Sequence, residues 1–181
     1  MERNIAYVAL FAALIAVLGF IPPVSLAAGI PPITAQSLGI MLCGTVLGAR
    51  RGALAVVLFL MLVAVGLPLL SGGRGGLGVF ASGSVGFLIG FPVAAFVAGW
   101  VMERSTLPVV WAAGVGAVIG GIGVLYVFGI AGLSVMLGKT VGEAAQIAIA
   151  YLPGDAIKVV LCAFMTQALA RMRPDALLSR A

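Results

Sequence analysis

The stretch "RRGALAVVLFLMLVAVGLPLLSGGR" at residues 50–74 decides the class of this protein. Two arginines open it and one closes it, and no residue between them carries a charge. The uncharged run is longer than the roughly 20 apolar residues that a helix needs to cross a bilayer. It therefore predicts a transmembrane helix followed by a glycine-rich loop.

The rest of the chain repeats this pattern. Of its 181 residues, 63% are hydrophobic and only 8% are charged, whereas a soluble domain has roughly 25% charged residues. Uncharged runs also cover 4–49, 75–102 and 105–138. No stretch is left for a soluble domain, so 1–181 is predicted to be one membrane domain. A signal peptide explains the first run less well, because that run is long, ends at Pro-Pro and precedes further spans.

Prolines and glycines divide the chain into six predicted helices. Pro-Pro pairs at 22–23 and 31–32 bound the first loop, since proline cannot donate within a helix. The stretch 129–151 is rich in glycine breaks and is predicted to be an outer loop with short helical pieces. Abundant small residues favour close helix contact, so we expect a compact all-α bundle. The predicted helices cover about 4–21, 34–48, 53–70, 79–102, 109–128 and 153–171.

The basic residues predict the orientation. If both termini are cytoplasmic, the outer loops hold only Arg74 and Lys139, as the positive-inside rule requires. Trp100 and Trp111 then lie at inner helix ends, within the interfacial aromatic belt. We expect the plasma (inner) membrane, with both termini in the cytoplasm. The inner set would be Arg3, Arg50, Arg51, Arg104, Arg171, Arg173 and Arg180.

The sequence offers little for enzyme chemistry. It contains no histidine and no GxxxxGK[ST] motif for ATP. Cys43 and Cys162 are isolated in apolar runs and are interpreted as small buried hydrophobes. The scattered basic residues make no nucleic-acid face. We expect no catalytic activity, no metal and no cofactor.

One charged pair stands inside an apolar stretch, "YLPGDAIKVVLCAFM" at 151–165. Asp155 and Lys158 are three positions apart, which places both on one helical face near the outer leaflet. A charge in the membrane costs roughly 2.5 to 3.5 kcal/mol on insertion scales, so such residues usually face a cavity or pathway. The alternative is that Asp155 caps the helix while Lys158 extends its charge outward.

Three other side chains belong to the same predicted outer side. Thr34 and Gln36 start the second helix, and Arg74 lies in the glycine-rich loop. Together with the charged pair they could form one outward-facing pocket for a small ligand that carries both hydrogen-bonding groups and an anion. As alternatives, Thr34 and Gln36 could only cap their helix, and Arg74 could be a solvated loop charge. The loop stretch "SGGRGGLG" lacks the lysine and hydroxyl of a phosphate-binding loop. We expect its glycines to let the backbone pass close to a ligand or helix.

The helix at 4–21 carries a face of small residues. Ala9 and Ala13 are four positions apart, as are Ala12 and Ala16. This small-xxx-small spacing suits helix contact, either within the bundle or with a partner chain.

The chain resembles BioY, the biotin-binding S component (substrate-binding subunit) of energy-coupling factor (ECF) vitamin transporters. The resemblance covers nearly the whole chain through three ordered motifs, "PITAQSLG" at 32–39, "LGARRGALAVVLFLMLVAVGLPLLSGGRGG" at 47–76 and "LPGDAIKVVL" at 152–161. The chain departs from the family pattern at 82–87, where "SGSVGF" replaces an expected Gly-Pro-Thr-x-Gly-Tyr. Arg74 occupies a position that is expected to vary.

The resemblance implies a six-helix bundle with an outward pocket for biotin. It places Asp155 and Lys158 in that pocket, with Gln36 and the loop glycines Gly73, Gly75 and Gly76 nearby. It further implies uptake with a transmembrane coupling (T) subunit and ATP-binding-cassette ATPases in trans, and gives the alanine face of the first helix to the coupling subunit.

Three rival hypotheses stay open at this point. An ion- or proton-coupled secondary transporter would use Asp155 and need no ATPase. A membrane-embedded enzyme would need paired catalytic groups, and a structural subunit would bind no small ligand. The sequence also leaves a homo-oligomer open, as well as the end of biotin that each charged residue would hold.

Overall fold

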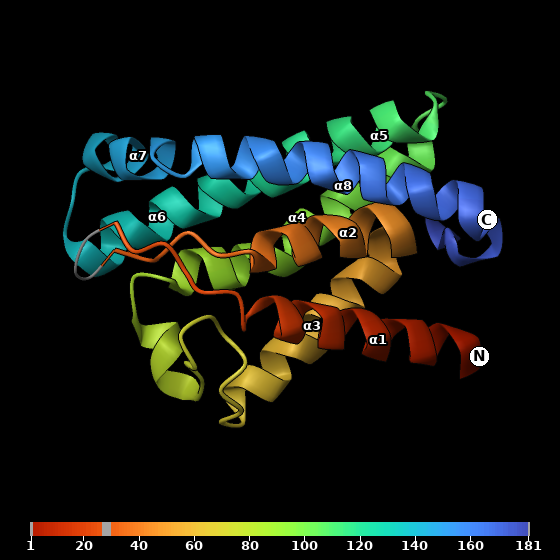
Figure 1. Ribbon diagram of the computed structural model, residues 1–181. Helices are drawn as coiled ribbons and strands as arrows, with labels where there is room; N and C mark the ends of the chain where they lie inside the picture. The colour runs from red at the N-terminus through yellow and green to blue at the C-terminus, as the bar shows by residue number, and fades with distance from the viewer. Residues whose placement is uncertain (1, 27–29, 181) are drawn as a thin grey trace.

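The computed structural model describes residues 2–26 and 30–180, and in these ranges every regular element is helical (Figure 1). A π-helical segment, Ala117–Val124, joins α5 to α6, so that Val109–Leu137 is one continuous helix. A short 3₁₀ helix, Leu77–Ala81, precedes α4. The α-helices are α1 (Glu2–Leu18), α2 (Gln36–Leu47), α3 (Ala49–Ala64), α4 (Val85–Arg104), α5 (Val109–Gly116), α6 (Leu125–Leu137), α7 (Val141–Ile149) and α8 (Leu152–Met172).

Helix α2 lies in the middle of the bundle, and all of its residues are buried. It packs against α4, α3 and α8, and small residues bring the backbones close together. A Cβ atom on Gly44 would lie 2.8 Å from the Cβ atom of Ala98 in α4. The start of α2 is therefore a fixed point against which the loops at the end of the bundle opposite the termini can be positioned.

Three described helices are long and apolar enough to cross a membrane: Val85–Arg104, Val109–Leu137 and Leu152–Met172. Their lipid-facing sides expose large apolar residues such as Val127, Val135 and Phe164. With its apolar composition, the chain is a membrane protein. The helices α1, α2 and α3 are shorter, with 17, 12 and 16 residues.

The fifth helix extends beyond the predicted 109–128. It continues through Gly129 and Gly132 to Leu137, where the prediction had an outer loop. These glycines do not break the helix, because they are contact points: Gly129 faces the ring of Phe87, and Gly132 faces the backbone of Gly86. In a membrane bundle, glycine inside a helix lets the backbones of two helices approach closely.

The rest of the predicted loop is also mostly helical. The helix ends at Gly138, which adopts a left-handed φ of 61°. A capping box between Thr140 and Glu143 then starts α7. Helix α4 begins at Val85 rather than at the predicted 79, because Leu77–Ala81 forms the separate 3₁₀ helix.

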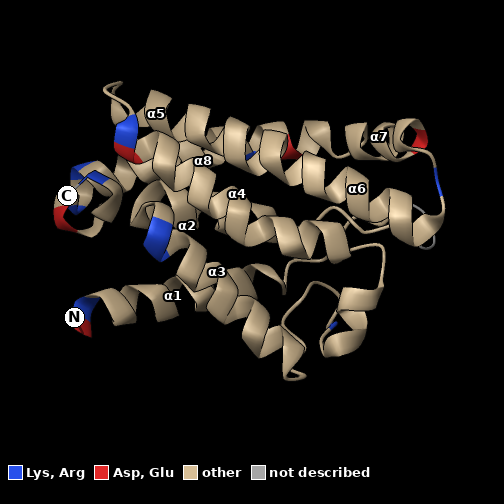
Figure 2. Ribbon diagram, turned by 180° about the vertical axis from the view of Figure 1, so that it is seen from behind, with Lys and Arg blue, Asp and Glu red and all other residues tan. Residues whose placement is uncertain are grey.

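Both ends of the chain lie at the same end of the bundle (Figure 1). Figure 2 shows that most Lys and Arg residues gather at this end. The C-terminal segment packs back onto it: Leu177 and Leu178 are buried, and the Ser179 hydroxyl donates to the Thr45 carbonyl at 2.5 Å. Arg180 donates to the Ser105 carbonyl at 2.6 Å. The C-terminal segment thus covers the charged end of the bundle.

Candidate ligand-binding site

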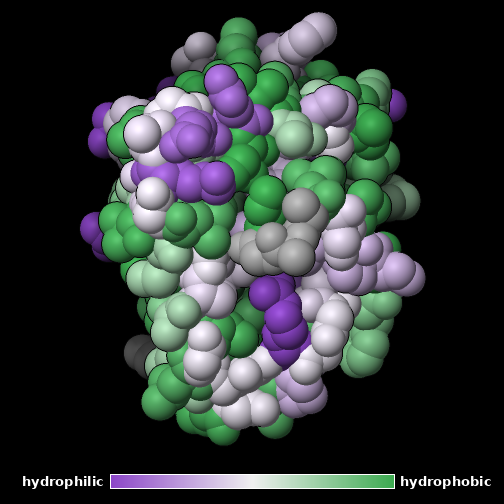
Figure 3. All heavy atoms as spheres, turned by 90° about the vertical axis from the view of Figure 1, so that its left-hand side faces the viewer, coloured by the Kyte–Doolittle hydropathy of each residue, from purple (hydrophilic) through white to green (hydrophobic). Residues whose placement is uncertain are grey.

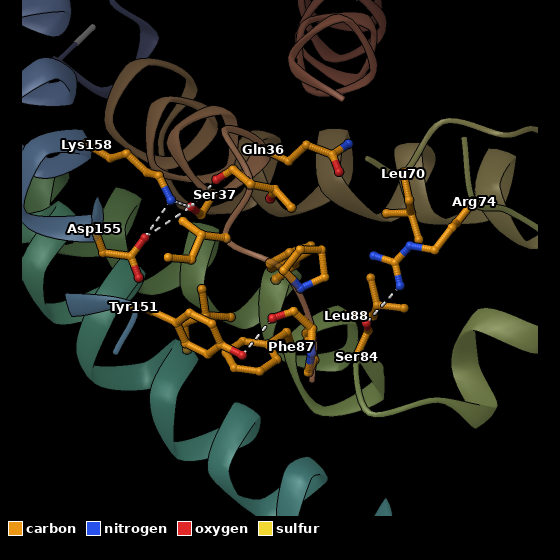
Figure 4. A pocket seen from close by; sticks show the side chains of 16 residues that line it. Gln36, Ser37, Leu70, Arg74, Ser84, Phe87, Leu88, Tyr151, Asp155 and Lys158 are labelled. Atoms are coloured by element: carbon orange, nitrogen blue, oxygen red, sulfur yellow. Dashed lines mark hydrogen bonds and ion pairs between the residues drawn. The ribbon is translucent and has the colours of Figure 1, made fainter. Parts of the chain in front are cut away.

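A pocket opens at the end of the bundle opposite the termini. Figure 4 shows its lining, and Figure 3 shows this end of the molecule, where apolar and hydrophilic residues are mixed and a hydrophilic group lies near the centre. Helices α2, α4, α6 and α8 contribute to the walls, as do the segment 31–34 and the loop between α3 and α4. The lining residues are Pro31, Pro32, Ile33, Thr34, Gln36, Ser37, Leu70, Arg74, Ser84, Phe87, Leu88, Phe91, Leu125, Tyr151, Asp155 and Lys158.

The structure brings Asp155 and Lys158 together at one side of this pocket. Lys158 Nζ lies 2.8 Å from Asp155 Oδ1 and donates a second hydrogen bond to Ser37 Oγ at 2.9 Å. The Ser37 hydroxyl is also within 3.3 Å of Asp155 Oδ1. Both charged side chains are largely shielded, with side-chain exposures of 12% for Lys158 and 7% for Asp155. A buried ion pair of this kind needs additional polar partners, and Ser37 supplies one.

Tyr126 of α6 completes the environment of the carboxylate. Its hydroxyl donates to Asp155 Oδ2 at 2.9 Å, so that the carboxylate accepts hydrogen bonds from side chains of three helices. Lys158 uses two of its three N–H donors on described residues. Its third donor can therefore serve a ligand. Asp155 is not the N-cap of α8, which is Tyr151, and its bonds go to side chains rather than to helix N–H groups.

Arg74 lies across the pocket from the Asp155–Lys158 pair (Figure 4). It ends a tight turn in which Gly72 and Gly73 have φ angles of 79° and 69°. Its Nε donates to the Ser71 carbonyl and its Nη1 to Ser84 Oγ, both at 3.2 Å. It forms no ion pair with any residue of 2–26 or 30–180. Arg74 is therefore a pocket residue fixed by two hydrogen bonds rather than a solvated loop charge. Its remaining N–H groups can bind an anion.

The walls between the two charged ends are apolar. They consist of leucine, phenylalanine, proline and isoleucine side chains. Phe87 and Tyr151 meet edge to face, with ring centroids 5.7 Å apart. The Tyr151 hydroxyl donates to the Pro31 carbonyl at 2.8 Å, which holds the segment 31–34 in the pocket wall. A ligand with two polar ends and an apolar middle fits this arrangement.

Gln36 lines the pocket, but its carboxamide bonds the protein. Nε2 donates to the Ile15 and Leu69 carbonyls at 3.1 and 3.0 Å, and Oε1 accepts from the Ser71 N–H at 3.0 Å. Thr34 also lines the pocket, and its carbonyl lies 3.4 Å from Ser37 Oγ. Neither side chain caps α2.

The loop glycines act through the backbone. Gly73, Gly75 and Gly76 do not belong to the pocket lining. Gly73 and Gly76 have positive φ angles, and a Cβ atom on Gly75 would collide with the Leu67 carbonyl. They shape the turn that carries Arg74.

The alanine face of α1 divides into two sides. Ala12 is buried and Ala16 is partly buried against the core, so this pair packs within the bundle. Ala9 and Ala13 are exposed and are left for lipid or a partner.

The sequence analysis did not predict Ser37, Ser84 and Tyr151, which are polar residues of the pocket lining, or Tyr126, which contacts Asp155 from outside the lining. Ser37 follows Gln36 in the motif "PITAQSLG", and this position could have indicated a place in the pocket. Tyr126 gave a weaker signal, as a hydroxyl inside the apolar run 105–138. Ser84 belongs to the departing stretch "SGSVGF", which now proves to contact Arg74.

Residues 2–175 match the family model described as "BioY family". The chain belongs to the BioY family. It is 50% identical over 192 residues to "Biotin transporter BioY" of Rhodobacter capsulatus, covering 99% of this chain and 100% of that protein. A second BioY relative, "Biotin transporter BioY" of Rhizobium etli, is 50% identical over 92% of each chain.

A solved structure shows the same fold. It is described as the crystal structure of the S-component for biotin from an ECF-type ABC transporter. The TM-score is 0.88 at 28% identity, covering 94% of this chain and 92% of that chain. The resemblance to BioY drawn from the three motifs is thereby confirmed. BioY relatives are named as transporters, and nothing among these matches is named as an enzyme.

Proposed function

We propose that this chain captures biotin from the outer side of the plasma membrane for uptake into the cell. Its BioY relatives are named biotin transporters, and the similar solved structure is an S-component for biotin. The positive-inside rule assigns the arginine-rich end, which carries both termini, to the cytoplasm. The pocket at the opposite end then faces outward.

The observation that carries this proposal is the two-ended pocket. Biotin has a ureido group at one end, an apolar bicycle and aliphatic chain in the middle, and a carboxylate at the other end. The ureido N–H groups suit the Asp155 carboxylate, and the ureido carbonyl suits the remaining Lys158 donor. The valerate carboxylate suits Arg74 across the pocket. The apolar walls between them suit the thioether ring and chain.

Energy for uphill transport comes, in this proposal, from other chains. The sequence has no ATP-binding motif of the P-loop type. The S-component likeness supports a transmembrane coupling subunit and ATP-binding-cassette ATPases as partners. The exposed Ala9–Ala13 side of α1 offers a flat face for the coupling subunit.

The first test is equilibrium binding of biotin to the purified chain in detergent. Desthiobiotin, which keeps the ureido and carboxylate ends, should compete, and an unrelated vitamin should not. Binding should weaken at least about tenfold in Lys158→Ala, because the cation that serves both Asp155 and the ligand is lost. No saturable binding by folded protein would contradict the proposal.

A second test separates the ECF mechanism from ion coupling through Asp155. Biotin uptake is measured in proteoliposomes that contain the chain with and without coupling and ATPase subunits. ATP-dependent uptake only with partners supports the proposal. Uptake by the chain alone that follows a proton or ion gradient would favour a secondary transporter.

A further inference from the structure

We propose that Gln36 is a positioning residue, whose carboxamide fixes the Leu70–Arg74 turn so that the Arg74 guanidinium faces the carboxylate of the ligand. The inference rests on the proposed function, because it takes biotin as the ligand and Arg74 as the partner of its carboxylate. It assigns to Gln36 an effect on one end of the ligand only.

The bonds of Gln36 hold the backbone on both sides of Leu70. Its Nε2 donates to the Leu69 carbonyl and its Oε1 accepts from the Ser71 N–H, each at 3.0 Å. The carboxamide therefore pairs with this segment as the backbone of a neighbouring strand would. Gln36 is almost fully buried, with 2% of the residue exposed, so loss of these bonds would leave buried backbone groups unpaired.

The turn passes this constraint on to Arg74. The backbones of Leu70 and Arg74 exchange two hydrogen bonds, at 3.0 and 3.2 Å. The Ser71 carbonyl accepts from Arg74 Nε at 3.2 Å, and Ser84 Oγ accepts from Nη1. The Ser71 residue is thus bonded to Gln36 through its N–H and to Arg74 through its carbonyl. A shift of Ser71 would move the guanidinium.

The turn has little rigidity of its own. Gly72 and Gly73 stand at its centre in left-handed conformations, and glycine populates many other conformations at small cost. Gln36, in contrast, starts α2, the fully buried helix of the bundle. It is also bonded to the Ile15 carbonyl at the end of α1. The side chain therefore transfers the fixed position of α2 to a flexible turn.

Direct contact with the ligand explains Gln36 less well. Both of its N–H donors are used on backbone carbonyls, and its oxygen already accepts from Ser71. Its side chain runs from α2 toward the turn, as Figure 4 shows. The Asp155–Lys158 pair, in turn, has no hydrogen bond to Gln36 within the described part of the chain.

The experiment compares two ligands in Gln36→Met, which keeps the length of the side chain and removes its hydrogen bonds. Biotin carries the carboxylate, whereas biotinol has an alcohol in its place. We expect the affinity for biotin to fall about tenfold, the size of one hydrogen bond to a charged group, and the affinity for biotinol to change less than about twofold. Thermal unfolding of each variant checks the fold.

Two further variants sharpen the comparison. Arg74→Gln should lower the affinity for biotin and leave the affinity for biotinol unchanged. In the double variant, Gln36→Met should add little to this loss of biotin affinity, because both substitutions act through the same guanidinium. Gln167→Met is the matched control: Gln167 Oε1 accepts from the Val110 N–H at 3.1 Å, at the end of the bundle with the termini. It should change neither affinity.

Equal losses for biotin and biotinol in Gln36→Met would overturn the inference, as would additive losses in the double variant. If Gln36→Met does not fold, Gln36→Asn decides, because it keeps an amide that is too short to bridge Leu69 and Ser71. In Gln36→Asn the affinity for biotin should fall and the affinity for biotinol should not. If Arg74→Gln fails to discriminate the two ligands, the proposed ligand orientation is wrong; if only the Gln36 variants fail to discriminate, this inference alone is wrong.

Discussion

At one end of the pocket, Asp155 and Lys158 come from a single turn of α8 and meet at 2.8 Å, whereas at the other end Arg74 comes from a glycine turn between α3 and α4. The helix sets the first geometry by its own period. The second depends on distant groups, namely Gln36 and Ser84. Two charged ends of one binding site can therefore be positioned in different ways, one by a single helix and the other by residues from several segments.

The largest expected effect breaks the helical end. Asp155→Asn leaves the buried Lys158 cation without a carboxylate, a change that costs roughly 3 to 5 kcal/mol when one partner of a buried pair is removed. Biotin affinity should fall at least tenfold and thermal stability should drop. The double variant Asp155→Asn with Lys158→Met should regain stability but not binding. Unchanged biotin affinity in folded Asp155→Asn would remove this pair from the ligand site.

The next effect strikes the turn. Gly73→Ala places a Cβ atom at a φ of 69°, where a non-glycine residue costs roughly 1 to 2 kcal/mol. No neighbouring atom would clash, so the strain falls on the turn itself. Biotin affinity should fall several-fold while biotinol affinity holds, as measured by competition binding. Equal weakening of both ligands would mean that the two ends of the pocket are not independent.

A smaller effect tests the support of the helical end. Tyr126→Phe removes the hydrogen bond to Asp155 Oδ2, which is worth about 1.5 to 3 kcal/mol at most for a charged acceptor. Because Lys158 and Ser37 still hold Oδ1, we expect affinity to fall less than in Asp155→Asn, and equally for biotin and biotinol. Tyr7→Phe, on α1 outside the pocket, serves as the control.

The smallest effect on binding belongs to α1. Ala9→Leu with Ala13→Leu enlarges only exposed positions and should leave biotin affinity unchanged while reducing ATP-dependent uptake with partner subunits. Ala12→Leu should instead lower thermal stability, because Ala12 is 3% exposed within the core. Full uptake in the Ala9/Ala13 variant would remove this face from the coupling interface.

The sequence predicts the helical end of the pocket better than the turn, and the reason is physical. The spacing of Asp155 and Lys158 is local, so their meeting follows from the helix. The bonds of Ser84 and Tyr126 join residues that approach only after packing, and no local pattern encodes them. Gln36 was expected near the ligand and lines the pocket, but its bonds to the turn depend on tertiary structure.

The helix predicted at 109–128 shows the same limit. Local propensity makes glycine a helix breaker in water, but at Gly129 and Gly132 contact with α4 outweighs that preference. The all-α class and the BioY family could be predicted, because they rest on composition and on motifs spread along the chain.

The π-helical segment Ala117–Val124 makes chain length, rather than residue identity, a determinant of the site. Its wider i→i+5 bonding accommodates more residues per turn than an α-helix does. Deletion of one residue there would rotate α6 by roughly 100° relative to α5. Tyr126 would then leave Asp155 although every side chain of the pocket was retained. An insertion or deletion here would therefore change the direction in which the side chains of α6 point. A residue-by-residue comparison of binding sites does not detect such a change.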